Sequence, residues 1–410
     1  MTKRRVVITG QGLISSIGNS IKEVTDSLFL GKSGIEHCAE YKEIGMASQV
    51  IGKMIKDPVA LIDDKVGRFM SKGAGMIYLS MLQAIKQANL KYGNISNPRT
   101  GALIGTGGGS PKEVVLVADT IRNSGIKKLG IRFVIKTIPS ASVANIVTLF
   151  GIKGISFCLS SACATSAHCI GEAFEKVLLG RQDVMFAGGT DESDWIIASN
   201  FDRIRALSTK YNDTPEKSSR PYDKDRDGFV LSGGAGIIVL EELEHALARG
   251  AEILAEIVGY GVSSDGEDMT RPSGEGGVRC MREAIENAGL TPSDISYINT
   301  HGTSTPVGDI VELRSIKEVF GENIPYISST KSLTGHGLGA SGVHEIIFSV
   351  IMLKNKFLAS SHNIETIDPL AEGYPILQKR KDNFESNAIL SNSFGFGGCN
   401  ATLIIKPFLL

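Results

Sequence analysis

Short apolar runs and longer amphipathic segments alternate along the first half of the chain. The runs are partly β-branched and predict strands at residues 5–9, 100–104, 155–159, 183–189 and 237–240. The amphipathic segments repeat apolar residues every three or four positions and predict helices at residues 68–90, 140–149 and 241–249. Strands that alternate with helices favour a mainly parallel α/β sheet covered by helices.

The second half of the chain repeats this theme. Strands are predicted at residues 295–300 and 324–329, helices at 277–288, 309–319 and 339–353, and a hairpin across a glycine-rich loop at 388–406. With 410 residues, the chain is longer than one hydrophobic core usually supports. We therefore expect a duplicated α/β fold, with an N-terminal half at residues 1–250 and a C-terminal half at residues 251–410.

Cys163 lies where the predicted strand at 155–159 turns into a helical pattern at 170–178. The small residues between them permit a sharp turn, and a helix start offers free N–H groups and the positive end of the helix dipole. Both would favour the thiolate and lower the pKa of the cysteine, and the same N–H groups can hold an oxyanion. The alternative is a buried structural cysteine, which this pattern alone does not exclude.

His301 and His336 each lie in a turn rich in glycine and threonine that follows a predicted strand. Together with Cys163 they fall at the carboxyl ends of strands, where open α/β sheets place their active sites. A cysteine with one histidine suggests protease-like acyl transfer, whereas two imidazoles can stabilise an oxyanion or an enolate. The remaining histidines lack such a context and are interpreted as capping or core residues: His37, His168, His245, His344 and His362.

The composition is that of an ordinary soluble globular enzyme, with 42% hydrophobic and 21% charged residues. The formal net charge of -1 provides no basic field, so nucleic acid is not expected as a partner. The apolar stretch at residues 346–353 is too short for a membrane span. The six cysteines include no C-x-x-C pair, which argues against zinc and a redox dithiol. Residues 1–8 do not resemble a secretory signal, so we expect a cytoplasmic protein.

Gly10 and Gly12 follow the first predicted strand and predict a turn there. They half-match a dinucleotide-binding fingerprint, but Ser15 stands at the third glycine position and no acidic residue is suitably placed downstream. Nucleotide binding is therefore not favoured.

Four segments resemble the β-ketoacyl-[acyl-carrier-protein] synthases, which are condensing enzymes of the thiolase fold. The segments are 161–168 (SACATSAH), 299–306 (NTHGTSTP), 330–336 (TKSLTGH) and 392–398 (NSFGFGG). The resemblance covers essentially the whole chain and implies a thiolase-like fold with a layered α-β-α-β-α core. The context at 193–201 and 206–217 looks closest to synthase I, an elongating enzyme of bacterial type II fatty acid synthesis. Synthase II shares the catalytic motifs and is the alternative.

The resemblance implies a decarboxylative Claisen condensation. Cys163 would take an acyl chain from acyl carrier protein, with its own N–H and that of Phe396 as the oxyanion hole. His301 and His336 would polarise the thioester carbonyl of malonyl carrier protein, so that decarboxylation to an enolate becomes easier. The enolate would attack the acyl-cysteine and lengthen the chain by two carbons. No cofactor or metal is implied beyond the phosphopantetheine of the carrier protein.

The resemblance also implies supporting roles. Lys331 would set the electrostatics of the site, paired with Glu312, and Phe396 would act as a gate between the acyl and malonyl steps. The remaining expected site residues are the organising carboxylates and the substrate-binding side chains, Asp227, Asp309, Thr303, Thr305 and Phe394. Cys399 departs from the family, which usually has threonine there, and this could alter the packing of the glycine-rich loop.

Acyl carrier proteins are acidic, so a basic patch would be needed to bind one. Candidates are Lys65, Arg68, Lys127 and Lys128, although ordinary solvated side chains are an equally good interpretation. The resemblance further implies a homodimer.

Two more distant alternatives remain. A CoA-dependent thiolase uses two cysteines and one histidine, whereas the second catalytic turn of this chain carries His336. A catalytically inactive chain-length partner would lack the nucleophile, and the presence of Cys163 opposes that interpretation.

Overall fold

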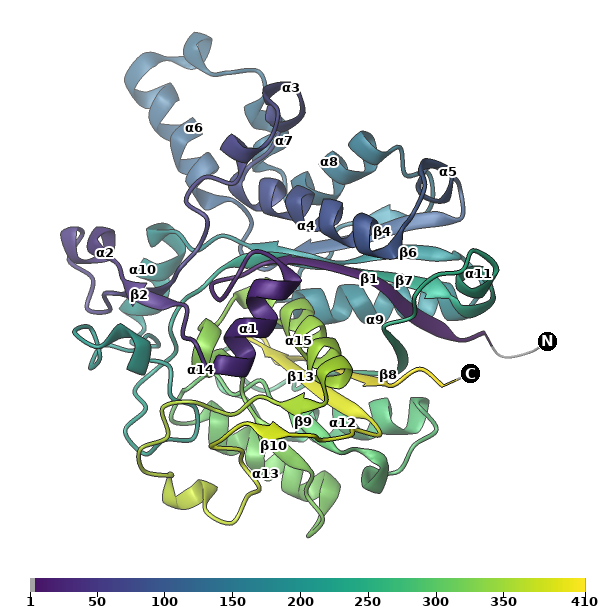
Figure 1. The fold of residues 1–410 in the computed structure, drawn as a ribbon. Coiled ribbons are helices and arrows are strands. Elements are labelled where there is room, and N and C mark those ends of the chain that lie inside the picture. Colours follow the sequence, from purple (N-terminus) through teal and green to yellow (C-terminus); the bar gives the residue numbers. More distant parts are fainter. Residues whose placement is uncertain (1–3, 410) are drawn as a thin grey trace.

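Ten strands form one mixed sheet in the computed structural model, which describes residues 4–409 (Figure 1). The strand order is β10-β9-β13-β14-β8-β1-β7-β6-β4-β5. The strands are β1 (Val6–Ile14), β4 (Thr100–Thr106), β5 (Ser156–Phe157), β6 (Val184–Asp191), β7 (Gly234–Glu242), β8 (Ala255–Ser264), β9 (Tyr297–Asn299), β10 (Tyr326–Ser328), β13 (Ile389–Gly395) and β14 (Cys399–Lys406).

The sheet consists of two five-stranded halves with the same internal arrangement. In the first half, β1 lies innermost, pairs antiparallel with β7, and β7 pairs antiparallel with β6, while β6, β4 and β5 run parallel to one another. In the second half, β8, β14, β13, β9 and β10 repeat this arrangement in the same order from the centre outwards. The halves meet where β1 and β8 pair antiparallel over three residues, Val6 to Ile8 opposite Ala255 to Ile257. This equivalence confirms the duplicated α/β architecture expected from the sequence.

Helices form three layers around the two halves of the sheet (Figure 1). The first half is covered on its outer face by α4 (Lys72–Ala88) and α8 (Ala141–Phe150), and the second half by α12 (Glu275–Asn287) and α13 (Gly308–Phe320). Between the halves lie α9 (Thr165–Leu178) and α15 (Ser341–Asn355), which contact strands of both. The layers are therefore α-β-α-β-α, as the resemblance implied.

The two central helices are buried because α15 is apolar on nearly every face and α9 turns a broad apolar face to the core. In α15, every residue from Ser341 to Met352 is buried, and a helix that is hydrophobic all round belongs in a core. In α9, Ile170, Phe174 and Val177 pack into the same core, and burial of each such side chain contributes about 1.5–3 kcal/mol. These helices therefore hold the two halves of the sheet together.

The first strand does not end at its glycines. β1 continues through Gly10 and Gly12 to Ile14, so the turn predicted there is wrong. A Cβ atom at Gly12 would lie 2.1 Å from the Ser80 carbonyl oxygen of α4, and one at Gly10 would lie 2.4 Å from the Ala84 oxygen. The glycines are required because α4 packs directly on the strand.

The strand before Cys163 is shorter and more exposed than the sequence predicts. The run at 155–159 forms only β5, which lies at one end of the sheet, and Phe157 is 41% exposed. A short apolar run predicts a buried strand, but it can also form the end strand of a sheet, where its apolar side chains remain exposed.

Smaller elements complete the chain. They are α1 (Ile21–Leu30), β2 (Ile35–His37), α2 (Ala39–Glu43), β3 (Val50–Gly52), α3 (Asp64–Gly67), α5 (Tyr92–Ile95), α6 (Pro111–Ser124), α7 (Phe133–Thr137), α10 (Trp195–Arg203), α11 (Leu243–Ala248), α14 (Lys331–Thr334), β11 (Phe357–Leu358) and β12 (Lys381–Asp382). Across residues 4–409, no helix combines the length and the hydropathy that a transmembrane span requires.

Candidate active site

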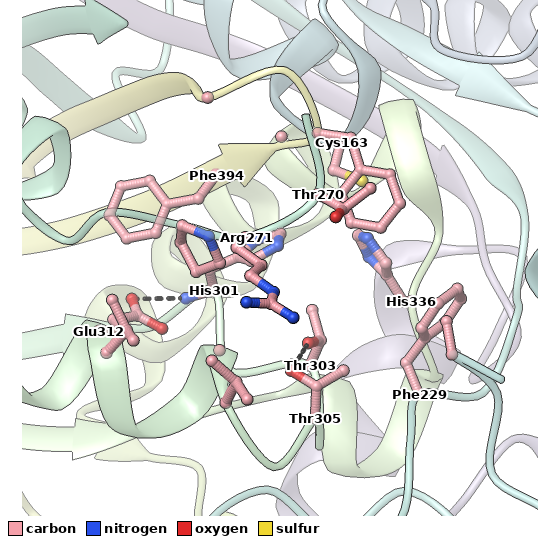
Figure 2. Close-up of a pocket in the computed structure, with 18 of the residues that line it drawn as sticks. Cys163, Phe229, Thr270, Arg271, His301, Thr303, Thr305, Glu312, His336 and Phe394 are labelled. Atoms are coloured by element: carbon pink, nitrogen blue, oxygen red, sulfur yellow. Dashed lines mark hydrogen bonds between the residues drawn. The ribbon is translucent and has the colours of Figure 1, made fainter. Parts of the chain in front are cut away.

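A cavity of about 540 Å³ opens where loops from both halves of the fold meet. Its lining includes Cys163 from the first half and His301 and His336 from the second. Figure 2 shows these three side chains turned towards the same space. The three residues that the sequence places far apart are thus brought together at the carboxyl ends of their strands.

Cys163 lies in a 3₁₀ turn, Ala162–Ala164, that connects β5 to α9. The preceding Ala162 has a φ of 51°, a left-handed conformation that is rare for residues with a side chain and marks a tight, strained turn. A Cβ atom at Gly395 would lie 2.8 Å from the Ser161 carbonyl oxygen, so only glycine lets the β13–β14 loop approach this turn so closely. The sharp turn expected from the small residues is present.

The pKa of the Cys163 thiol does not follow the sequence prediction. Burial, and secondarily the negative charge of Asp191, raise this pKa to about 12, although the Lys331 ammonium and the backbone N–H groups of Phe396 and Cys163 oppose the increase. Desolvation of the thiolate therefore outweighs the effect of the helix start, and the expected lowering of the Cys163 pKa is wrong. The two N–H groups beside the sulfur are those expected to form the oxyanion hole.

The two imidazoles lie against each other and are held in their neutral forms. The ring centroids of His301 and His336 are 5.2 Å apart and the ring planes are nearly perpendicular. Burial is the main cause that lowers both pKa values well below the ordinary value, and the positive charge of Lys331 adds to it. The Nδ1 atom of His336 lies 3.1 Å from the Ser341 hydroxyl. When that hydroxyl donates, the ring carries its proton on Nε2 as a hydrogen-bond donor.

Lys331 is buried and pairs with Glu345 of α15, not with Glu312 as the resemblance implied. Both side chains are only 2% exposed. Burial raises the pKa of Glu345 to about 7 even though Lys331 opposes the increase. The Lys331 ammonium lies close to both imidazoles, and its positive charge disfavours their protonation.

Glu312 instead holds the turn that carries His301. Its carboxylate accepts hydrogen bonds from the backbone N–H of His301 at 2.9 Å, from that of Gly302 at 2.8 Å and from the Asn392 amide at 3.1 Å. Burial nevertheless raises the pKa of Glu312 to about 7. Glu312 is thus a positioning residue for the histidine.

Asp309 and Asp227 organise neighbouring loops. Asp309 accepts hydrogen bonds from the backbone N–H groups of Ser304 and Thr305 and lies 3.4 Å from the Arg226 guanidinium. Asp227 lines the cavity and accepts hydrogen bonds from the Ser208 hydroxyl and the Thr209 N–H. Both positions fit the organising role that the resemblance implied.

The expected substrate-binding residues all line the cavity. The hydroxyl oxygens of Thr303 and Thr305 are 3.2 Å apart (Figure 2). The Phe394 ring lies 5.9 Å from that of His301, and the Phe396 ring lies 6.0 Å from that of Phe201. Phe396 is 41% exposed on the β13–β14 loop, so its ring stands at the cavity wall rather than in the core.

The expected basic patch lies away from the cavity. Lys65 and Arg68 belong to α3 and its C-terminal cap, and Lys127 and Lys128 belong to a 3₁₀ turn between α6 and α7. All four side chains are exposed, and none lines the cavity. Figure 1 shows α3, α6 and α7 gathered in one lobe at the upper left of the molecule.

Sequence reasoning missed Asp191, a buried carboxylate close to Cys163. It accepts hydrogen bonds from the Thr106 hydroxyl at 2.8 Å and from the backbone N–H groups of Gly107 at 3.0 Å, Gly108 at 2.8 Å and Gly339 at 2.6 Å. Burial raises its pKa to about 6. The signal was available, because Asp191 lies two residues after the apolar strand that was predicted to end at residue 189.

Glu345 also had a signal in the sequence. It is the one acidic residue in the apolar helical pattern at 339–353, and a buried carboxylate requires a partner. Among the other histidines, His344 lies in the core and its Nε2 contacts the carbonyl oxygens of Ile14 and Ala235. In the part of the chain that the structure describes, no cluster of three or more His, Cys, Asp or Glu side chains could hold a metal ion.

Comparison with known proteins agrees with this geometry. Residues 3–246 match the family model described as the beta-ketoacyl synthase N-terminal domain, and residues 254–365 match the C-terminal domain. The chain is 55% identical over 406 residues to 3-oxoacyl-[acyl-carrier-protein] synthase 1 of Haemophilus influenzae, covering 99% of each chain. It is 38% identical over 414 residues to synthase 2 of Coxiella burnetii, again covering 99% of each.

A solved structure shares the fold over its whole length. A beta-ketoacyl synthase from Burkholderia phymatum aligns with a TM-score of 0.93 and 32% identity, covering 99% of this chain and 100% of that one. Both family domains, the full-length relatives and the thiolase-like fold therefore agree, and the chain belongs to the β-ketoacyl synthase family.

Proposed function

We propose that this protein condenses an acyl chain with malonyl-[acyl-carrier protein] and so elongates fatty acids by two carbons. The observation that carries the proposal is the convergence of one cysteine thiol and two neutral imidazoles, Cys163, His301 and His336, on a single cavity. The N-terminal half, 1–250, supplies the nucleophile, and the C-terminal half, 251–410, supplies the histidines.

In the first step, the Cys163 sulfur attacks the thioester carbonyl of acyl carrier protein. A new thioester forms on Cys163, and the carrier protein leaves as a thiol that takes the cysteine proton. The backbone N–H groups of Phe396 and Cys163 lie against the sulfur and stabilise the oxyanion that develops during attack. Because the free thiol has a pKa of about 12, the thiolate forms as the reaction proceeds rather than standing ready beforehand.

In the second step, malonyl carrier protein enters and loses CO₂. The electrons of the broken C–C bond form an enolate, whose oxygen accepts hydrogen bonds from His301 and His336. Neutral imidazoles can donate to this oxygen without a positive charge of their own, and donors fixed in a dry site lower the barrier most effectively. The enolate carbon then attacks the acyl-cysteine, and the Cys163 sulfur leaves as a thiolate that takes a proton from solvent.

The same division of labour assigns the supporting residues. Lys331, paired with Glu345, keeps the imidazoles neutral. Glu312 and Asp309 hold the turn at residues 301–305, which carries His301, Thr303 and Thr305. Thr303, Thr305 and Phe394 contact the pantetheine arm, and Phe396 separates the acyl from the malonyl step. Asp227 holds the loop that forms the opposite wall of the cavity.

Synthase I activity is favoured over synthase II because identity to the synthase 1 relative is 55% and to the synthase 2 relative 38%. A thiolase is disfavoured because the second turn carries His336, and an inactive chain-length partner is disfavoured because the nucleophile is present.

The substrates are carried on the phosphopantetheine of acyl carrier protein, and no further cofactor is part of the proposal. The reaction is assigned to the cytoplasm, as the sequence suggested.

The carrier protein and a second copy of the chain are the proposed partners. The basic side chains Lys65, Arg68, Lys127 and Lys128 offer complementary charge to an acidic carrier protein. Beside them, α6, α7 and the segment between these helices expose apolar side chains, including Ile131 at 91% and Val134 at 64%, and Phe157 of the end strand β5 is 41% exposed. Exposed apolar surface of this kind marks an interaction site, and we assign it to the homodimer contact.

The proposal is tested by elongation of acyl carrier protein in a purified system. Cys163→Ala is expected to lower formation of the two-carbon-longer product by at least about 10³-fold, because no acyl-cysteine can form. Cys163→Gln is expected to retain decarboxylation of malonyl carrier protein. Cys399→Thr is the matched control, because it changes another cysteine of the same site region to the usual family residue and should leave elongation intact. Elongation by Cys163→Ala would refute the mechanism.

A further inference from the structure

Arg271 lines the catalytic cavity from the loop between β8 and α12. Figure 2 shows its side chain pointing into the cavity, on the side of Thr303 and Thr305. The side chain is exposed, and its guanidinium forms no ion pair among residues 4–409, whereas Arg279 and Arg282 on the following helix each pair with a glutamate. Its charge is therefore available to a ligand.

The carboxylates around the cavity are already occupied. Asp265 accepts hydrogen bonds from the Ser273 N–H and the Asn400 amide, and Asp268 accepts them from the backbone N–H groups of Thr270 and Arg271. Asp227 and Glu312, which complete the acidic lining, are held by backbone N–H groups in the same way. The negative charges are thus engaged by backbone donors, while the guanidinium donors stay open.

Arg205 provides a second guanidinium in the same lining, from the segment after α10. Its φ of 58° is the left-handed conformation that commonly follows a helix end, because the N–H groups of Arg205 and Ala206 donate to the carbonyls of Asp202 and Phe201 in the last turn of α10. Arg205 is exposed and likewise forms no ion pair within the described part of the chain. Two guanidinium groups in one cavity lining, both without an ion-pair partner among residues 4–409, provide positive charge for an anionic ligand.

We propose that Arg271, assisted by Arg205, forms a subsite in the wall of the active-site cavity that binds the phosphate of the pantetheine arm. The inference rests on the proposed function, since it requires a substrate delivered on phosphopantetheine. A guanidinium presents a planar fork of N–H donors that matches two phosphate oxygens. The subsite fixes one end of the arm while its thioester reaches Cys163, so Arg271 is a positioning residue.

The test compares two minimal substrates that differ only in the phosphate. Octanoyl-phosphopantetheine and octanoyl-pantetheine are each offered to the enzyme, and the rate of acyl transfer to Cys163 is followed by the mass of the intact protein. Arg271→Gln is expected to lower kcat/KM for the phosphorylated substrate about tenfold or more, mostly through KM, because charge-assisted hydrogen bonds are lost. The unphosphorylated substrate should change less than twofold, and Arg205→Gln should show a smaller selective loss.

Arg203→Gln is the matched control, because Arg203 is an exposed arginine two residues from Arg205 that does not line the cavity. Equal loss with both substrates, or no loss with either, would overturn the subsite. Malonyl-phosphopantetheine and malonyl-pantetheine form a second pair, followed by CO₂ release; a loss confined to this pair would also overturn the subsite and assign the guanidinium to the malonyl carboxylate. Failure of the unmodified enzyme to load either substrate would instead refute the proposed function.

Discussion

The turns that follow β4 and β9 occupy equivalent places in the two halves, yet they carry different chemistry. After β4 come Gly107 and Gly108, whose N–H groups donate to Asp191. After β9 come His301 and Gly302, whose N–H groups donate to Glu312. In both halves a buried carboxylate fixes the turn, but only the second half places an imidazole on it. The shared scaffold sets the position, and one residue decides the chemistry.

The turns that follow β5 and β10 make the same point. Both lead into a central helix, and both contain a non-glycine residue in the left-handed region, Ala162 with φ 51° and Leu338 with φ 49°. The first turn presents Cys163 and backbone donors, whereas the second presents His336 and Lys331, which pairs with Glu345 of α15. A cavity between the halves therefore receives a nucleophile from one side and proton donors from the other.

The contributions of Asp191 and Glu312 to stability can be measured separately by replacing each carboxylate with an amide. In Asp191→Asn, an NH₂ group replaces one carboxylate oxygen, so two of the four donors around Asp191 lose their acceptor. Each unsatisfied buried donor is expected to lower the free energy of unfolding by about 1–3 kcal/mol. Glu312→Gln is expected to lower the free energy of unfolding by less, because Glu312 accepts fewer hydrogen bonds. Urea unfolding at pH 8, where both carboxylates are ionised, measures the difference.

Exposed Glu267 provides the control for this comparison, as Glu267→Gln removes a carboxylate that lies on the surface. Its unfolding free energy should match that of the unmodified protein within about 0.5 kcal/mol. If Asp191→Asn is no less stable than Glu267→Gln, the carboxylate does not hold the turn.

The protonation states of the histidines provide a second test of the turn that carries His301 and the turn that carries His336. Burial, with the charge of Lys331, lowers the pKa values of His301 and His336, so both rings should stay neutral from pH 7.5 down to 5.5. His245 is the internal control, because its hydrogen bond to Glu241 raises its pKa and the ring should become protonated over that range. Nitrogen NMR of ¹⁵N-histidine-labelled protein, assigned with single His→Ala variants, separates the two behaviours. Protonation of His301 and His336 near pH 6.5 would contradict the account.

The sequence predicted the elements that depend on local pattern. The helical repeats gave α4, α8, α12, α13 and α15 to within a few residues, because their apolar stripes meet the core of each half. Cys163, His301 and His336 could be grouped because each follows a strand, and strands of one sheet end at a common edge. The residues of the cavity wall followed from the family resemblance rather than from any pattern.

Properties that depend on three-dimensional neighbours could not be predicted. The partner of Lys331 is Glu345, which lies 14 positions further along, because α15 rather than α13 passes beside the lysine. The helix start suggested a lower pKa for Cys163, but the degree of burial, which decides the balance, is not written in the local sequence. The exposed edge position of β5 likewise depends on the order of strands.

The central claim is that Cys163 and the two histidines serve separate steps, and His336→Ala tests it most directly. Acyl loading of Cys163 and CO₂ release from malonyl carrier protein are measured on the same variant. Loss of one enolate donor should lower CO₂ release by about 10²–10³-fold, while the rate of acyl loading stays close to that of the unmodified protein. An equal fall in both rates would show that the imidazole serves the cysteine as well, and the separate roles of Cys163 and the histidines would be wrong.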